Sequence, residues 1–186
     1  MDFAALPTSV ERHFQPSARG TRYEDRPNLD GWMIVSSSSA GTFRTLQCFR
    51  DGAVEMVRDI GSAVYGPTVE GERKRYSGHV IEGEIVDLVT KARAWCELVD
   101  VSPPLIVYVT LTGVVGQEHS RGGDPYDPMD AHFDRDVVSL PGVVVSEEVQ
   151  DVPRALRPVL DMVWQAAGWT CSPNFTKEGD WKGREQ

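Results

Sequence analysis

The spacing of apolar residues along the chain predicts a long amphipathic helix in its middle. Within 79–100 an apolar residue recurs at every third or fourth position, which is the period of one helix face. The residues of this stripe are Ile81, Ile85, Leu88, Ala92, Trp95 and Val99. Pro103 and Pro104 follow and prevent the helix from continuing, because proline lacks the N–H that another turn needs.

A second apolar stripe predicts another helix near the C-terminus. Its members are Leu156, Val159, Leu160, Val163, Trp164 and Ala167. Asp151 is suited to cap the first turn, and Gly168 is suited to end the helix. Pro158 predicts either that the regular helix begins there or that its first turn is kinked.

The dipeptide Asp51-Gly52 lies between two strand-like stretches and predicts a β-hairpin over 45–58. Both residues tolerate the positive φ angles of a two-residue type I′ turn. In the register that this turn sets, the residues of the core face are Phe49, Val54 and Met56. Those of the opposite face are Leu46, Cys48, Glu55 and Val57. Cys48 is expected to be a structural thiol.

Two further stretches rich in β-branched residues predict neighbouring strands. The stretch 105–115 is apolar on both faces, so we expect a central strand that is covered on both sides. The stretch 137–145 returns as a strand that Pro141-Gly142 interrupts, which is typical of an edge strand or a bulge.

The order of these elements, strand, hairpin, helix, two strands and helix, is typical of an α+β fold. We predict a two-layer sandwich in which a mostly antiparallel sheet carries two helices mainly on one face. Residues 1–30 are rich in Pro, Arg and Asp and are expected to form an extended N-terminal arm. We expect 31–175 to be a single α+β domain and 176–186 to be a polar tail that frays.

The composition indicates a globular protein that does not cross a membrane. Of the 186 residues, 40% are hydrophobic and 25% are charged, and the longest apolar run is far shorter than the roughly 20 residues of a membrane helix. No secretory signal is expected at the N-terminus, and three widely spaced cysteines suit reduced thiols. We therefore expect a cytoplasmic protein.

The charge of the chain disfavours direct binding of nucleic acid. The net charge is -9, and residues 76–186 contain nine Lys or Arg against eighteen Asp or Glu. This acidic part would repel a phosphate backbone.

Two groups of side chains are candidates for binding a partner. Arg44, Arg50 and Arg58 lie on the predicted hairpin, where a planar guanidinium can bind a phosphate or a carboxylate. The alternative for these arginines is charge on a solvent face. Trp169 and Phe175 can form a binding platform near the C-terminus, or they can clamp the tail onto its own domain.

The segment 118–136 is the candidate for catalytic chemistry, because it combines carboxylates with histidines. Carboxylates can bind Mg²⁺ or Mn²⁺, and a histidine can act as a ligand or a general base. The candidate metal ligands are Asp124, Asp127, Asp130 and His132. Their spacing matches no metal motif, and Pro125 and Pro128 are typical of a surface loop. A solvated loop is favoured over the alternative, a metal-dependent hydrolase or nuclease.

Five stretches together carry a family resemblance, and they are RPNLDGWMIVSSS (26–38), LQCFRDGAVEMVR (46–58), PPLIVYVTLTGVVG (103–116), DRDVVSLPGVVV (134–145) and LRPVLDMVWQAAGWTCSPNF (156–175). Over residues 26–181 the chain resembles the C-terminal region of bacterial proteins that carry an N-terminal AlbA-like domain of the Schlafen type. The motifs FR-x-G and W-x-A-A-G-W-x-x-S-P-N-F are the more specific parts. In such proteins the AlbA-like domain is regarded as the part that binds nucleic acid, and these stretches do not include it. The resemblance implies a companion domain for oligomerisation or for sensing a partner, without a catalytic motif.

We therefore expect a non-catalytic interaction or regulatory domain without a cofactor. Its partner would be another protein or a second copy of the chain, and it would accompany a nucleic-acid-binding domain. The sequence lacks G-x-x-x-x-G-K-[ST], G-x-S-x-G and C-x-x-C, which are common enzyme signatures.

Overall fold

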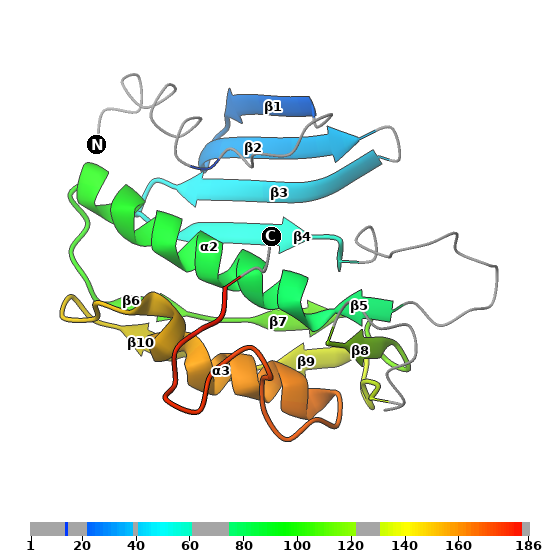
Figure 1. Ribbon diagram of the computed structural model, residues 1–186. Helices are drawn as coiled ribbons and strands as arrows, with labels where there is room; N and C mark the ends of the chain where they lie inside the picture. The colour runs from blue at the N-terminus through cyan, green and yellow to red at the C-terminus, as the bar shows by residue number, and fades with distance from the viewer. Residues whose placement is uncertain (1–13, 15–21, 39–40, 61–74, 122–130, 184–186) are drawn as a thin grey trace. The chain divides into compact units, whose positions relative to one another are not determined.

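The computed structural model describes residues 14, 22–38, 41–60, 75–121 and 131–183 (Figure 1). The chain divides into two compact units. The first unit comprises Met1–Ser62 with Thr90–Ser102, and the second comprises Ala63–Val89 with Pro103–Gln186. Helix α2 (Gly78–Leu98) contributes residues to both units.

The first unit contains a four-stranded antiparallel sheet whose strands lie side by side in chain order (Figure 1). The strands are β1 (Arg22–Pro27), β2 (Gly31–Ser38), β3 (Gly41–Phe49) and β4 (Val54–Arg58). Strand β1 lies within the predicted N-terminal arm and pairs with β2 along its whole length. This part of the arm is therefore an edge strand of the sheet.

One face of this sheet is buried. Its buried apolar residues are Trp32, Ile34, Leu46 and Cys48. Trp95, on the last part of α2, is also buried and packs edge-on against Phe14, with ring centroids 6.1 Å apart. Burial, together with the nearby Cys96, raises the pKa of the Cys48 thiol to about 12. Cys48 is thus an inert part of the packing, as predicted.

The hairpin between β3 and β4 has a three-residue turn where a two-residue turn was predicted. The N–H of Phe49 donates to the carbonyl of Ala53 at 2.8 Å. Within the turn only Gly52 has a positive φ, at 93°. A type I′ turn requires positive φ at both central residues, whereas a three-residue loop requires it only at its last position.

The longer turn shifts the register of the hairpin by one residue. Cys48 pairs with Val54. Leu46 pairs with Met56. Because a shift of one residue moves a strand's side chains to the other face, the predicted core face was wrong for Phe49, and Leu46 and Cys48 are buried instead.

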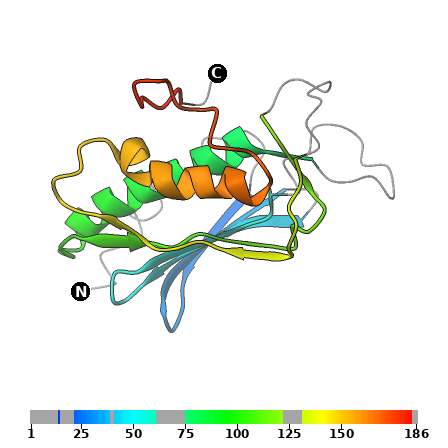
Figure 2. The ribbon, with the colours of Figure 1, turned by 90° about the horizontal axis from the view of Figure 1, so that it is seen from below.

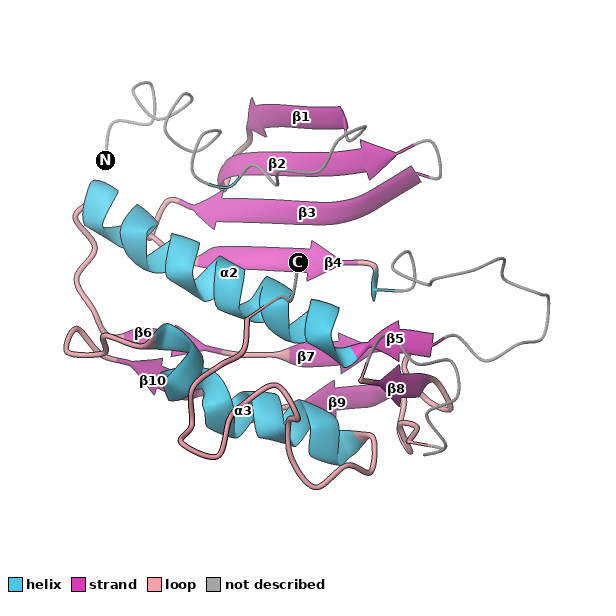
Figure 3. Ribbon diagram, in the orientation of Figure 1, coloured by secondary structure: helices cyan, strands magenta, loops and turns pink. Residues whose placement is uncertain are grey.

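The second unit contains three two-stranded pairs among its described residues (Figure 3). The parallel pair is β5 (Arg75–Ser77) with β8 (Glu118–Ser120). The antiparallel pairs are β6 (Leu105–Val107) with β10 (Val143–Val145) and β7 (Thr110–Thr112) with β9 (Val137–Ser139). A hydrogen bond of 3.0 Å from the N–H of Leu140 to the carbonyl of Val109 links the two antiparallel pairs. Residues 105–112 and 137–145 thus form one long strand pair, interrupted at Pro141-Gly142 as predicted.

Helix α3 (Val152–Ala166) begins where the sequence predicts. The Asp151 carboxylate caps it by accepting the N–H of Arg154 at 3.0 Å. Pro158 lies inside the helix, so of the two alternatives stated for this proline, the one in which the regular helix begins there was wrong. In the described part of the chain, no helix combines the length and apolar character that a membrane span requires.

Within the second unit, α3 and the first part of α2 lie on one side of the long strand pair (Figure 2). The buried residues of their shared core are Val86, Val89, Val145, Val152, Leu156, Val159, Leu160 and Phe175. The predicted α+β class is confirmed. In this unit the helices cover one face of the strands, in agreement with the prediction.

The stretch 105–115 is not the central, doubly covered strand that was predicted. Among the described residues, β6 and β7 each pair with one other strand only. Ile106 and Tyr108 are exposed. Apolar residues on both faces predict two covered faces, but here one apolar face is open.

We expect Gly52→Ala to lower the free energy of unfolding by about 2–4 kcal/mol. The alanine would have to adopt a left-handed backbone conformation, and its added methyl group would clash with a neighbouring side chain. A Cβ at Gly52 would lie 2.6 Å from Cγ2 of Val101. Gly116→Ala is the control, because Gly116 also has a positive φ, of 70°, but a Cβ there meets nothing within 4 Å. Its cost should be about 1–2 kcal/mol. Equal losses in urea denaturation would contradict the packing of the turn against Val101.

Candidate functional site

The three hairpin arginines do not converge on one site. Arg44 and Arg58 are register partners at one end of the hairpin, and Arg44 is buried, with its Nε donating to the Met56 sulfur at 3.2 Å. Arg50 lies in the turn at the other end and donates to the carbonyl of Leu29 at 3.0 Å. Their predicted role in binding remains a prediction, and it cannot be a joint role of all three.

Trp169 and Phe175 are buried, which matches the clamp alternative better than an open binding platform. The Trp169 indole donates to the carbonyl of His119 at 3.0 Å. Phe175 belongs to the core beneath α3, and the guanidinium of Arg157 lies 5.0 Å from its ring centroid. The two aromatic residues attach the segment after α3 to its own unit.

The tail after Phe175 is folded through residue 183, so the prediction that it frays was wrong for this part. The N–H of Thr176 donates to the carbonyl of Asp180 at 2.8 Å. The N–H of Lys182 donates to the carbonyl of Asn174 at 2.9 Å, and Phe175 and Trp181 form a β-bridge. The segment after Phe175 therefore turns back on itself. Its polar composition gave no indication of this turn.

The candidate metal ligands Asp124, Asp127 and Asp130 lie outside the described residues. His132 is described and exposed. In the part of the chain that the structure describes, no group of three or more His, Cys, Asp or Glu could hold a metal ion.

Both ends of the segment 118–136 are more ordered than a solvated loop. Glu118–Ser120 forms strand β8, and His119 is 1% exposed. Ala131 and Phe133 are also buried. The prediction of a solvated loop was wrong at these positions, because β8 pairs with β5 and residues 132 and 133 form bridges to Glu118 and Val115.

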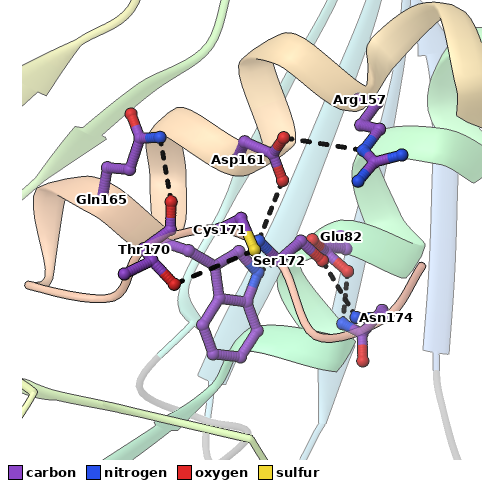
Figure 4. Close-up of polar contacts among 9 residues, drawn as sticks. Glu82, Arg157, Asp161, Gln165, Thr170, Cys171, Ser172 and Asn174 are labelled. Carbon is purple, nitrogen blue, oxygen red and sulfur yellow. Dashed lines mark hydrogen bonds and ion pairs between the residues drawn. The ribbon is translucent and has the colours of Figure 1, made fainter. Parts of the chain in front are cut away.

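A buried carboxylate joins three segments of the second unit. Glu82, on α2, has no exposed surface. It accepts the indole N–H of Trp164 at 2.8 Å and the side-chain amide of Asn174. Figure 4 shows Glu82 and Asn174 pointing toward one another. Since a buried carboxylate is costly unless it is hydrogen-bonded, this pairing fixes α2, α3 and the C-terminal segment together.

Further polar contacts attach the segment after α3 to that helix (Figure 4). The Asp161 carboxylate accepts the N–H of Ser172 at 2.9 Å and lies 3.6 Å from Nε of Arg157. Gln165 donates to the carbonyl of Thr170 at 3.1 Å. These groups bond to neighbouring segments of their own unit, which is a structural use of polar side chains.

His119 is enclosed by aromatic rings. Its ring centroid lies 4.4 Å from that of Trp164 and 5.4 Å from that of Phe133, both edge-on. The backbone of Gly78 lies against it, because a Cβ at Gly78 would be 2.6 Å from Nε2 of His119. Neither ring nitrogen has a hydrogen-bond partner among the residues that the structure describes, and burial lowers the pKa of His119 to about 4. Enclosed in this way, the His119 ring contributes to the packing of the aromatic side chains around it.

The face of the long strand pair opposite the helices is exposed and carries no charge. We define the outer face by the residues Ile106, Tyr108, Thr110, Thr112, Val137, Ser139 and Val144. The exposed fractions of its apolar residues are 57% for Ile106, 73% for Tyr108, 51% for Val137 and 60% for Val144. Single exposed apolar residues are common, whereas a contiguous exposed apolar patch is typical of an interaction surface. The outer face is therefore the candidate site.

The sequence did not predict the buried hydrogen bonds of Glu82 with Trp164 and Asn174, nor the outer face. A signal for Glu82 was present, since this acid falls beside Ile81 and Ile85 in the apolar half of the predicted helix. A charged residue in such a place requires a buried partner. No comparable signal identifies the outer face, because its residues also suit a covered strand.

Comparisons with known proteins leave the function to be argued from this geometry. No family model matches the chain, and neither a curated protein nor a solved structure matches it.

We expect Glu82→Ala to lower the free energy of unfolding by about 2–5 kcal/mol, because it leaves two buried donors without an acceptor. Glu82→Gln keeps one acceptor oxygen and should lose less. Glu97→Ala is the control, since Glu97 is an exposed acid on the same helix, and its effect should stay within about 0.5 kcal/mol. Chemical denaturation that gives equal values for Glu82→Ala and Glu97→Ala would refute the role of Glu82.

We expect acid to destabilise the protein through His119. The pKa of this buried imidazole is about 4 in the folded chain against 6.5 for an ordinary histidine, so the unfolded chain binds a proton that the folded chain excludes. The free energy of unfolding should fall by about 3 kcal/mol as the pH drops from 6.5 to 4. His119→Phe should remove this component from denaturation curves recorded across that range. An unchanged pH dependence in the variant would show that His119 is not its source.

Proposed function

We propose that this chain is a non-catalytic interaction domain that binds a partner protein through the outer face. The observation that carries the proposal is the exposure of four apolar side chains on one face, Ile106, Tyr108, Val137 and Val144. Burying them against a partner removes apolar surface from water, which contributes roughly 25 cal/mol per Å². Tyrosine is also among the residues enriched at protein interfaces.

Three buried or half-buried polar side chains support a role without catalysis. Glu82 and Asp161 direct their oxygens to donors of their own unit. His119 is neutral and packed against aromatic rings. A catalytic acid or base needs to reach the proton that it transfers, and these groups are committed to holding the fold.

The proposed setting is a bacterial cytoplasmic protein that accompanies a nucleic-acid-binding domain. The resemblance to the C-terminal region of proteins with a Schlafen-type AlbA-like domain supports this setting. So does the acidity of residues 76–186, since an acidic chain repels phosphates and leaves contact with nucleic acid to its partner. The free cysteines Cys48, Cys96 and Cys171 suit a reducing compartment.

The double variant Ile106→Asp with Tyr108→Asp tests the proposal. Sedimentation velocity would follow self-association, and affinity capture with mass spectrometry would follow other partners. We expect the variant to lose complexes that the wild-type chain forms, because burying two added charges is costly. Leu29→Asp is the control, as Leu29 is an apolar residue of the first unit that is 89% exposed. A monomeric wild-type chain that captures the same proteins as the double variant would overturn the proposal.

A further inference from the structure

Acidic side chains bracket the strand 137–145 of the outer face. Asp134 and Asp136 directly precede this strand, Glu147 and Glu148 closely follow it, and all four residues are exposed. Arg135 forms an ion pair with Asp134 at 2.9 Å, and Asp136 adds a negative charge that this pair does not neutralise. The uncharged surface therefore lies between two negative ends, separated by a distance on the order of 30 Å at about 3.3 Å per strand residue.

The dimensions of the outer face suit one helix. Two strands with their usual spacing present a surface about 10 Å wide, and the stretch from Ile106 to Thr112 is about 20 Å long. A single α-helix has a diameter of about 10 Å, and about 13 residues of helix cover 20 Å. The opposite face of the same strands is already packed against α3 and the first part of α2.

We infer that the outer face binds one amphipathic helix of a partner protein, with Lys or Arg at both ends of its apolar stripe. This inference rests on the interaction function proposed above. The apolar stripe would pack on Ile106, Tyr108 and Val144. The basic ends would lie near Asp136 and near Glu148, where opposite charges steer binding and fix its direction.

A second copy of the chain is a poorer occupant of this face. Two outer faces packed together would bring the acidic ends of one copy near those of the other, in a chain whose net charge is -9. Like charges placed opposite one another across an interface oppose association. A basic helix meets the same ends with attraction.

A phage-displayed library of amphipathic helices tests the inference. The apolar stripe would be kept, and the positions at both ends would vary among Lys, Arg, Glu, Gln and Ser. Selection would use the full chain, and clones would be counted as face-dependent when they fail to bind the Ile106→Asp, Tyr108→Asp double variant. We expect face-dependent clones to carry Lys or Arg at both ends. They should bind the double variant Asp136→Lys, Glu148→Lys about tenfold more weakly than the wild-type chain, and high salt should reduce this difference.

The outcomes separate the inference from the proposed function. Face-dependent clones with neutral or acidic ends, or clones unaffected by the two lysine substitutions, would overturn the basic character of the partner while leaving the interaction function intact. Self-association that the outer-face double variant abolishes would identify a second copy as the occupant and would also overturn the inference. Loss of all binding by a double variant whose urea midpoint is unchanged excludes misfolding as the cause.

Discussion

The second unit depends on a carboxylate that is wholly removed from water. Glu82 accepts hydrogen bonds from Trp164 and Asn174, residues that are 82 and 92 positions away in sequence. Its two oxygens thus connect the first part of α2 with α3 and with the segment that follows α3. The long strand pair packs against these helices, so the orientation of its exposed face also depends on this buried anchor.

Local patterns predicted the helices and the fold class. The apolar period of α3 is strong because this helix buries one stripe, and Asp151 marks its start through its own side chain. The stripe predicted for α2 was right for Ile81, Trp95 and Val99, but Ile85 and Leu88 are only half-buried, and Val86 and Val89 are buried instead. The hairpin was also predicted, but its register was wrong. Asp51-Gly52 fits two turn types, and only the backbone shows that Gly52 alone has a positive φ.

The surroundings of His119, the open face of the strand pair and the separation of the hairpin arginines could not be predicted from sequence. Each of them depends on contacts between distant segments. Nothing near His119 in sequence shows that Trp164 and Phe133 enclose it. The open side of 105–112 was missed because apolar residues do not report whether a partner element covers them. The hairpin arginines looked like a cluster in sequence, yet the strands place Arg44 and Arg50 at opposite ends.

The close approach at the start of α2 links three distant positions. The imidazole of His119 and the indole of Trp164 lie so near the backbone of Gly78 that an added methyl group would lie 2.6 Å and 2.3 Å from their atoms. A side chain at position 78 requires a smaller group at 119 or 164. Homologues with the same packing should therefore show coordinated replacement, in which a larger residue at 78 accompanies the loss of one of these rings.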